Sequence, residues 1–426
     1  MAKKSLFVDL SVLRDNRNFR NVFIARTISL LGLGMLSVAL PMQVYQLTGD
    51  SLQVGVVMAL EGIGLFVGLL LGGVLADRKD RKTLILFARA VCGLGFLGLA
   101  ANAWLPNPSL WAIYVLSVWD GFFGALGITA LMAAMPFIVG REMLMQARAV
   151  SMVSIRLATV ISPALGGVII AASHVGWAYL IAALGTALTL LPLLSLPSMK
   201  PAEVEENHPL RALAQGFQFM ISHKIIFSVV LVGTLITLTT AIRVLFPALA
   251  ETAYGGGAFE LGLMYSAVPL GATLGAIISG WANDLTRPGW VMGITSLGAC
   301  ACLMGLGVNQ NFILALVLLA AFGYLVSIAS LLQYTLVQVH TPDQYLGRVN
   351  ALWTAQDASG DSLGSIGIGL LGKFMSSLAS IFALGVIAFS ATLVIFGVCK
   401  SLREARLDDA SAEVEEGASG ALAEEA

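Results

Sequence analysis

The chain has 426 residues, of which 58% are hydrophobic and 12% are charged, a formal net charge of −1 and a mean hydropathy of +0.87. An average soluble domain is about 25% charged, so this composition excludes a water-soluble globule and predicts a chain that uses lipid as its solvent. The near-zero net charge also excludes a broadly basic surface that binds nucleic acid.

Residues 1–19 are predicted to form a cytoplasmic N-terminal segment. The stretch is basic and contains neither a long apolar run nor a cleavage site, which is not the pattern of a signal peptide. We therefore expect membrane insertion to use the first apolar helix itself. The cations up to the start of that helix are Lys3, Lys4, Arg14, Arg17 and Arg20.

Twelve apolar stretches follow, and each is long enough to cross a bilayer, which takes about 17–25 residues of helix. The sequence therefore predicts an all-α membrane protein with twelve transmembrane helices. The four cysteines lie within or at the end of these stretches, so we expect small packed residues and not disulfide partners. The predicted spans are 20–44, 52–76, 83–104, 109–136, 146–172, 175–196, 225–250, 259–283, 289–308, 312–338, 347–372 and 376–400.

Charge alternates along the connections between these spans. The connections on one side are rich in Lys and Arg, whereas the opposite turns contain Asp50, Glu251 and Glu260, with Lys373 as their only cation. Because cytoplasmic loops carry an excess of Lys and Arg, both termini are predicted to be cytoplasmic, in a multi-pass protein of the bacterial inner membrane.

The longest interior polar stretch, 197–224, separates six predicted spans from six. It divides the chain into an N-terminal bundle, 20–196, and a C-terminal bundle, 225–400. Its second part has apolar residues at helical spacing, which predicts an amphipathic helix along the cytoplasmic membrane surface. The acidic tail, 401–426, is predicted to be a cytoplasmic segment without a packed core. The apolar residues at helical spacing in the linker are Leu210, Leu213, Phe217 and Met220.

The two halves of the chain resemble each other. Five residues in the second span of the first half align without gaps on identical residues in the second span of the second half, and this predicts two six-helix pseudo-repeats. The aligned sets are Gly55, Gly64, Gly68, Gly73 and Asp77, and Gly262, Gly271, Gly275, Gly280 and Asp284. Arg148 and Ser162 align on Arg348 and Ser362 at a slightly different offset.

The connection between the second and third spans reads Gly-Val-Leu-Ala-Asp-Arg-Lys-Asp-Arg-Lys over 73–82. It resembles the G-x-L-A-D-R-x-G-R-K signature of the major facilitator superfamily and departs from it only at Asp80. The resemblance implies a cytoplasmic gate, and the alternative is a loop that is basic only because of its topology. The expected gate residues are Gly73, Asp77, Arg78, Arg81, Lys82, Asp284, Arg148 and Arg348.

The fifth span contains Ser162, Pro163, Gly166 and Gly167. These residues resemble the core of the antiporter motif of the same superfamily, which is associated with export, although Ala or Ser replaces three of its glycines. Proline removes one backbone hydrogen bond, and glycine permits close helix packing. An ordinary proline kink is the alternative interpretation.

Ionisable residues inside spans are costly and usually functional. Asp120 lies about 16 Å along the fourth span at 1.5 Å per residue, and Arg156 is expected at a similar depth in the fifth. A carboxylate beside an arginine can alternate between a paired and a protonated form, as proton coupling requires. A permanent structural ion pair is the alternative. The candidate residues for substrate or proton coupling are Asp120, Arg156, Arg26, Glu61, Arg243, Trp353, Gln356, Asp357 and Asp361.

Further expectations concern two of these assignments and one more intramembrane cation, Arg89. Glu61 is expected to meet Arg26. Asp357 and Asp361, one helical turn apart, are expected to share a proton or bind a cationic group, and the alternative is a position close to solvent in an outward vestibule. Arg89 is expected to extend toward the membrane surface. The arginine motif that some drug antiporters carry in the fourth span is absent from this sequence.

The sequence contains no constellation of a hydrolase, kinase or redox enzyme and no G-x-x-x-x-G-K-[ST] phosphate loop. We therefore expect a non-enzyme without cofactor or metal, driven by an ion gradient. The expected partners are a small-molecule substrate, protons and the bilayer, with outer-membrane efflux components as further candidates. Members of the superfamily usually act as monomers.

Longer runs, among them 116–123, 139–147, 190–197 and 331–335, resemble siderophore-exporting members of the major facilitator superfamily. The resemblance covers nearly all of both halves. It implies export of a catecholate siderophore to the periplasm by proton antiport. Two alternatives remain open: a multidrug antiporter of the same superfamily, and a membrane scaffold or sensor that transports nothing.

Overall fold

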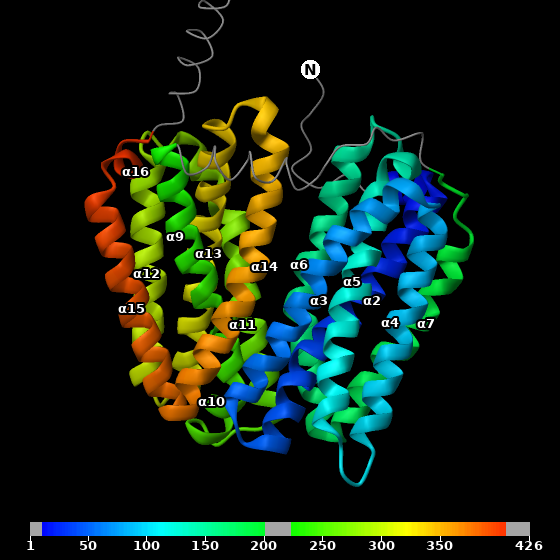
Figure 1. Ribbon diagram of the computed structural model, residues 1–426, viewed down its shortest axis with the longest axis horizontal. Helices are drawn as coiled ribbons and strands as arrows, with labels where there is room; N and C mark the ends of the chain where they lie inside the picture. Colours follow the sequence, from blue (N-terminus) through cyan, green and yellow to red (C-terminus); the bar gives the residue numbers. More distant parts are fainter. Residues whose placement is uncertain (1–10, 201–222, 406–426) are drawn as a thin grey trace, which may run out of the picture. The chain divides into compact units, whose positions relative to one another are not determined.

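A computed structural model describes residues 11–200 and 223–405 of the chain (Figure 1). Every regular element in these residues is helical. The first part contains α1 (Ser11–Asp15), α2 (Arg17–Thr48), α3 (Ser51–Arg78), α4 (Arg81–Ala103), α5 (Leu110–Val139), α6 (Leu144–Ala172) and α7 (Val175–Leu194). The second part contains α9 (Lys224–Thr240), η1 (Ala241–Leu245), α10 (Phe246–Thr252), α11 (Ala258–Ile278), η2 (Ser279–Asp284), α12 (Pro288–Val308), α13 (Phe312–Val339), α14 (Asp343–Phe374), α15 (Ser377–Val398) and α16 (Lys400–Glu404).

Eleven helices of the described residues are long and apolar enough to cross a membrane. The remaining predicted span, 347–372, corresponds to α14, whose 32 residues are long enough but include Asp357, Asp361 and Lys373. The prediction of an all-α membrane protein is thereby confirmed. The amphipathic helix predicted within the linker and most of the acidic tail lie outside the described residues, as does the start of the N-terminal segment.

The chain divides into two compact units. Unit 1 comprises Met1–Glu206, Ile242–Pro269 and Ser365–Ser377, and unit 2 comprises Asn207–Ala241, Leu270–Gly364 and Leu378–Ala426. Unit 1 therefore contains α1 to α7 together with α10, the first half of α11 and the C-terminal end of α14. Unit 2 contains α9, α12, α13, α15 and most of α14.

Glycines set the closest helix crossings inside each unit. In unit 1, a Cβ on Gly64 or Gly68 of α3 would collide with the backbone of α5 at Val118 or Phe122. In unit 2, Gly271 of α11 faces the backbone of Ala320 on α13 in the same way. Gly275, which the repeat aligns with Gly68, would place a Cβ 3.0 Å from the Tyr324 carbonyl oxygen. The aligned glycines of the two halves thus make equivalent contacts.

Each unit has its own apolar core. The core of unit 1 includes Phe19, Leu126 and Ala130, and that of unit 2 includes Val232, Ile328 and Leu336. Many other large apolar side chains of the transmembrane helices are exposed. An outer surface of this kind suits lipid, because helix packing in a bilayer depends on contact between small residues and not on the exclusion of water.

Candidate functional site

Asp120 of α5 is the most buried carboxylate among the described residues of unit 1, with an exposed fraction of 8%. The next residue, Gly121, lies against the Glu61 backbone of α3, because a Cβ there would overlap the Glu61 carbonyl oxygen. Glu61 and Arg89 are the charged groups that act electrostatically on Asp120. The α3–α5 crossing therefore brings two carboxylates from different helices into one electrostatic neighbourhood.

The expected pair between Asp120 and Arg156 is not observed in the described part of the chain. Asp120 Oδ1 is buried there without a hydrogen-bond partner, and the arginine that acts on this carboxylate is Arg89 of α4. The physical reason is helix order: α5 packs against α3 and α4 much more extensively than against α6, which carries Arg156.

Arg89 also differs from its expectation, since it turns into the helix bundle and not toward the membrane surface. With Arg26 of α2 it lines a small cavity, and the two guanidinium groups repel each other electrostatically. Arg89 is therefore the cation that acts on Asp120, and Arg26 acts in turn on Arg89. The other lining residues are Val22, Ala25, Ile85, Gly127, Leu131 and Leu193.

Arg243 lies in η1, the 3₁₀ turn that separates α9 from α10. The Tyr265 hydroxyl of α11 donates a hydrogen bond of 2.8 Å to the Arg243 carbonyl oxygen. Arg243 and Glu61 both act electrostatically on that hydroxyl. Arg243 and Tyr265 come from the second half of the sequence but belong to unit 1, where Tyr265 lies within the electrostatic reach of Glu61. Tyr265 was not among the residues singled out from the sequence.

A second polar group lies in unit 2, on α9, α13 and α14. The Trp353 indole donates to the Asp357 carboxylate at 2.8 Å, and the Thr237 hydroxyl donates to the other carboxylate oxygen at 3.2 Å. The Tyr334 and Trp353 rings are tilted by 60°, with their centroids 5.8 Å apart. This group of Thr237, Tyr334, Trp353 and Asp357 is called the aromatic patch below. Sequence reasoning found Trp353 and Asp357 but missed the residues on α9 and α13.

Two further candidates lie beside the aromatic patch on α14. The charge of Asp361 acts electrostatically on Asp357, as their spacing of one turn predicts. Gln356 Nε2 is buried without a hydrogen-bond partner among the described residues. A buried amide in this condition is unusual and is available to a ligand or a water molecule.

The connection between α3 and α4 is fastened by Asp80, the one position that departs from the superfamily signature. Its carboxylate accepts hydrogen bonds from the Ser198 hydroxyl at 2.7 Å and from the Met199 N–H at 2.8 Å. It also caps α4 by accepting from the Lys82 N–H at 3.1 Å. In return, the Arg81 N–H donates to the Met199 carbonyl at 3.2 Å. Asp80 therefore ties the segment after α7 to the start of α4.

The environment of Asp80 favours its ionised form. Burial alone raises the pKa of this carboxyl, but the three hydrogen bonds and the charge of Lys200 outweigh that effect and lower the pKa below its usual value. The contribution of this ion to stability is therefore fully present above the ordinary pKa of a free Asp and is lost as the pH falls through the lowered value.

The remaining gate residues are dispersed. Arg81 is only 8% exposed and lies over the Phe137 ring, 4.4 Å from its centroid, as a cation–π contact. Asp77 and Arg148 are exposed and make no ion pair with other described residues, and Arg78 and Lys82 likewise form none. Gly73 faces open space. The side chains of Asp284 and Arg348 lie outside those the structure describes.

The antiporter-like residues of α6 form close helix contacts. The Ser162 hydroxyl donates to the Ala158 carbonyl and faces Gly34 of α2. A Cβ on Gly166 would lie 3.0 Å from the Met35 Cα of α2. Gly167 packs on the other side, against Gly262 of α11.

Two glycine crossings lie within unit 1 at the end where α2 and α3 join, called the Asp50 end. At one, Gly55 of α3 meets the Ser365 carbonyl and Gly369 of α14. At the other, a Cβ on Gly262 of α11 would lie 2.7 Å from the Pro163 carbonyl and 2.9 Å from the Gly167 Cα. The sequence repeat aligns Gly55 with Gly262, so the two crossings are counterparts in the two halves.

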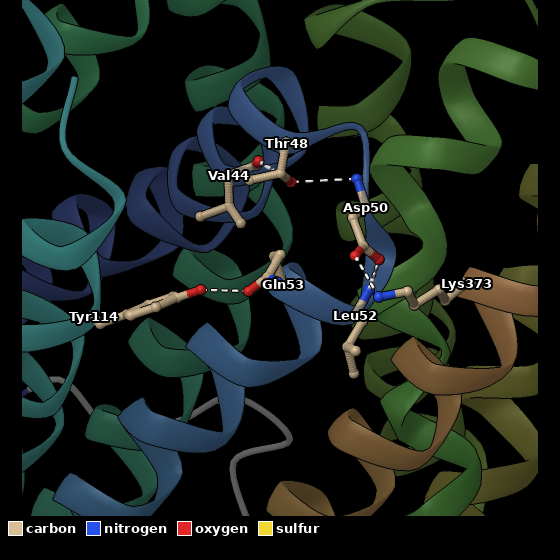
Figure 2. A network of polar contacts seen from close by, with 7 residues as sticks. All are labelled: Val44, Thr48, Asp50, Leu52, Gln53, Tyr114 and Lys373. Carbon is tan, nitrogen blue, oxygen red and sulfur yellow. Dashed lines mark hydrogen bonds and ion pairs between the residues drawn. The ribbon is translucent and has the colours of Figure 1, made fainter. Parts of the chain in front are cut away.

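A polar network accompanies the first of these crossings (Figure 2). Lys373 Nζ of α14 lies 3.5 Å from Asp50 Oδ2. The Asp50 carboxylate also accepts from the Leu52 N–H at 2.8 Å, and Tyr114 of α5 donates to Gln53. The signal for this pair was already in the sequence, because Lys373 is the only cation among the turns of its side.

Comparison with known proteins agrees with this architecture. Residues 22–365 match the Major Facilitator Superfamily. The chain is 48% identical over 385 residues to proteins named enterobactin exporter EntS from Escherichia coli O1:K1 and from Shigella boydii serotype 18, which covers 90% of this chain and 92% of each relative.

Solved structures of low sequence identity share the fold. They include a POT family transporter bound to a thioalcohol-conjugated peptide, with a TM-score of 0.71 at 14% identity over 91% of this chain and 96% of that one. They also include the nucleoside transporter NupG, with a TM-score of 0.68 at 14% identity over 91% of this chain and 100% of that one. The all-helical architecture, the glycine crossings repeated in the two halves and the family match lead to one conclusion: the chain belongs to the major facilitator superfamily, as a multi-pass membrane transporter of a small molecule.

Proposed function

We propose that this protein is a secondary active exporter that moves an enterobactin-like catecholate siderophore from the cytoplasm to the periplasm across the inner membrane. The observation that carries the proposal is the 48% identity to enterobactin exporters over 90% of the chain, in both halves. The antiporter-like residues of α6 support the direction of transport. The protein would act without enzymatic chemistry and without a cofactor.

The energy source in this proposal is the proton gradient, used by antiport. Asp120 is the carboxylate we assign to proton exchange, with Glu61 and Arg89 as the charged groups that act on it. When Asp120 is ionised, Arg89 stabilises it. When it is protonated, Arg89 becomes available to an anionic or carbonyl oxygen of the cargo. Each proton that binds Asp120 would then remove one negative charge beside the bound cargo.

In the proposed topology both termini and the Asp80 loop are cytoplasmic, and the Asp50 end faces the periplasm. The two glycine crossings and the Asp50–Lys373 pair then close unit 1 on its periplasmic side. Export requires these contacts to open while the signature loop, through Asp77 and Arg81, closes the cytoplasmic side. Segment 197–224 would connect the 20–196 and 225–400 bundles along the cytoplasmic surface. The protein would work as a monomer. It would deliver its cargo toward outer-membrane efflux components.

Siderophore secretion tests the proposal. The gene is deleted in its iron-starved host, and intact catecholate siderophore in the medium is quantified with wild type, Asp120→Asn and Arg156→Ala restored separately. Loss of the intact molecule, reversed by wild type and not by Asp120→Asn, supports the exporter. If secretion is unchanged in the deletion strain and its sensitivity to unrelated hydrophobic drugs increases, the cargo is a drug and the siderophore assignment is wrong.

A further inference from the structure

The aromatic patch of unit 2 combines apolar rings and a carboxylate on one exposed face. Tyr334 is 52% exposed, and its ring packs beside Trp353 at 5.8 Å. Asp357 is also exposed, although it holds hydrogen bonds from Trp353 and Thr237. Exposure of a carboxylate is unusual this far inside a transmembrane helix.

The position of Asp357 along α14 determines what this face meets. It lies about 21 Å from the start of the helix at 1.5 Å per residue, within a helix of 32 residues. An exposed carboxylate at this depth is not compatible with hydrocarbon, so the face that carries it is expected to border water and not lipid. Close packing of α14 on α9, where a Cβ on Gly360 would lie 3.2 Å from Thr237 Cγ2, holds the carboxylate against its threonine donor.

The geometry of the carboxylate determines which ligand groups it can take. An ionised carboxylate only accepts hydrogen bonds and has about four acceptor positions. The protein uses one oxygen for the Trp353 indole and the other for the Thr237 hydroxyl. Both oxygens therefore keep free acceptor positions, fixed in orientation, beside two aromatic rings. A flat ring that carries two adjacent hydroxyl donors matches this arrangement.

We infer that the aromatic patch is a subsite for one metal-free catechol ring and that Asp357 selects against the metal-loaded siderophore; this inference rests on the proposed function. A metal-free catechol offers two O–H donors to the carboxylate oxygens and stacks on Tyr334 or Trp353. In the ferric complex both hydroxyls have lost their protons to bind the metal. The complex then brings no donor and carries negative charge, which the charges of Asp357 and Asp361 repel.

The selectivity follows from the loss of charge-assisted hydrogen bonds. One such bond contributes about 1.5–3 kcal/mol, which corresponds to about a tenfold change in affinity or more. The subsite thus gives the exporter a means of releasing only siderophore that has not yet bound metal, without any contact with the metal itself.

The experiment is a binding titration on purified full-length protein in lipid nanodiscs. The two probes are the metal-free catecholate siderophore and its Ga³⁺ complex, which is redox-inert and has the charge of the ferric form. The variants are Asp357→Asn, Tyr334→Ala and, as a matched carboxylate control outside the patch, Asp50→Asn. Gel filtration and thermal unfolding establish that each variant is folded.

We expect wild type to bind the metal-free form at least about tenfold more tightly than the Ga³⁺ complex, as loss of one charge-assisted hydrogen bond requires. Asp357→Asn should bring the ratio close to one, Tyr334→Ala should weaken both forms together, and Asp50→Asn should keep the wild-type ratio. If wild type binds the metal-free form but Asp357→Asn retains its preference, the subsite is overturned and the exporter assignment stands. If wild type binds neither form, or takes up only lipophilic cations in a manner that depends on Asp357, both the subsite and the siderophore assignment are overturned.

Discussion

Lys373 of α14 reaches back to Asp50, the N-cap residue of α3, with 3.5 Å between the Nζ and Oδ2 atoms. The two side chains are 48% and 21% exposed, so water screens the pair only in part. The pair stands beside one of the two repeat-related glycine crossings. The repeat aligns Asp50 with Gly257, which has no side chain to make an equivalent pair. Gly257 therefore cannot supply the counterpart of this ion pair at the second crossing.

Removing this charge is predicted to loosen the closure without unfolding the protein. Asp50→Asn keeps an oxygen that can cap α3 and loses only the charge, while Lys373→Gln removes the partner. An ion pair of this exposure contributes about 0.2–1 kcal/mol, so each variant should fold normally and shift the open and closed populations by up to about fivefold. A double-mutant cycle on transport rate checks this, and additive effects of the two substitutions would show that the residues act separately.

The glycine crossings predict steric effects at specific positions. Gly55→Ala and Gly262→Ala place a Cβ against backbone carbonyl groups of α14 and α6, and backbone cannot move aside as a flexible side chain can. We expect the Asp50 end to open in both variants. Gly73→Ala is the matched control, because nothing lies within 4 Å of its added Cβ.

Cysteine labelling measures the opening. Ser51 is buried at this end and carries the reporter as Ser51→Cys, in a background without the four native cysteines. Labelling by a membrane-impermeant maleimide should increase in Gly55→Ala and Gly262→Ala and stay at the wild-type rate in Gly73→Ala. Equal labelling in all variants would mean that the crossings do not close this end.

Replacing Asp80 by the residue that the superfamily signature carries predicts a loss of stability. Asp80→Gly removes the carboxylate that holds Ser198, Met199 and the start of α4, and we expect about 1–2 kcal/mol of destabilisation, mainly from the lost hydrogen bonds to 198–199. Because the pKa of Asp80 is lowered, the difference from wild type should stay constant from neutral pH down to the ordinary pKa of an Asp, about 4, and shrink below it.

Thermal unfolding of both proteins as a function of pH measures this difference, with the exposed Asp77→Gly as the control. A difference that disappears already between pH 8 and 6 would contradict the role given to the Asp80 carboxylate.

The fold could be predicted from the sequence because it depends on patterns that repeat many times. Apolar stretches, alternating basic loops and aligned glycines each indicate the same twelve-helix arrangement. Gly64 and Gly68 illustrate this, because a glycine at a tight helix crossing is there to let two backbones approach. Their counterparts Gly271 and Gly275 make the equivalent contacts in the second half.

The partners of buried charges could not be predicted in the same way. Asp120 and Arg156 have similar depths in consecutive spans, but depth does not reveal which helix face a side chain occupies. The packing of α4 and α3 against α5 places Arg89 and Glu61 beside Asp120. Tyr334 was missed for a related reason, because an aromatic residue in a transmembrane helix is common and only its distance to Trp353 distinguishes it.

Because Arg89 and not Arg156 acts on Asp120, substitutions of these two arginines should have unequal effects on proton coupling. Asp120→Asn and Arg89→Gln should both abolish proton coupling, because they alter the buried carboxylate and its counter-charge. Cargo binding should persist in Asp120→Asn and weaken in Arg89→Gln, which also loses the proposed cargo contact. Arg156→Gln should retain coupling, since Arg156 does not act on Asp120. A pH indicator that follows proton release on addition of siderophore measures coupling directly. Loss of the signal in Arg156→Gln with full retention in Arg89→Gln would restore the pairing expected from the sequence.

Transport by the purified protein tests the central claim most directly. The protein is reconstituted into liposomes, a proton gradient of either direction is imposed, and uptake of metal-free catecholate siderophore is measured with Asp120→Asn as the control. Proton antiport predicts accumulation only when the lumen is acidic, collapse of that accumulation by a protonophore, and none in Asp120→Asn. Uptake that is independent of the gradient, or equal in the variant, would contradict a proton-coupled siderophore exporter.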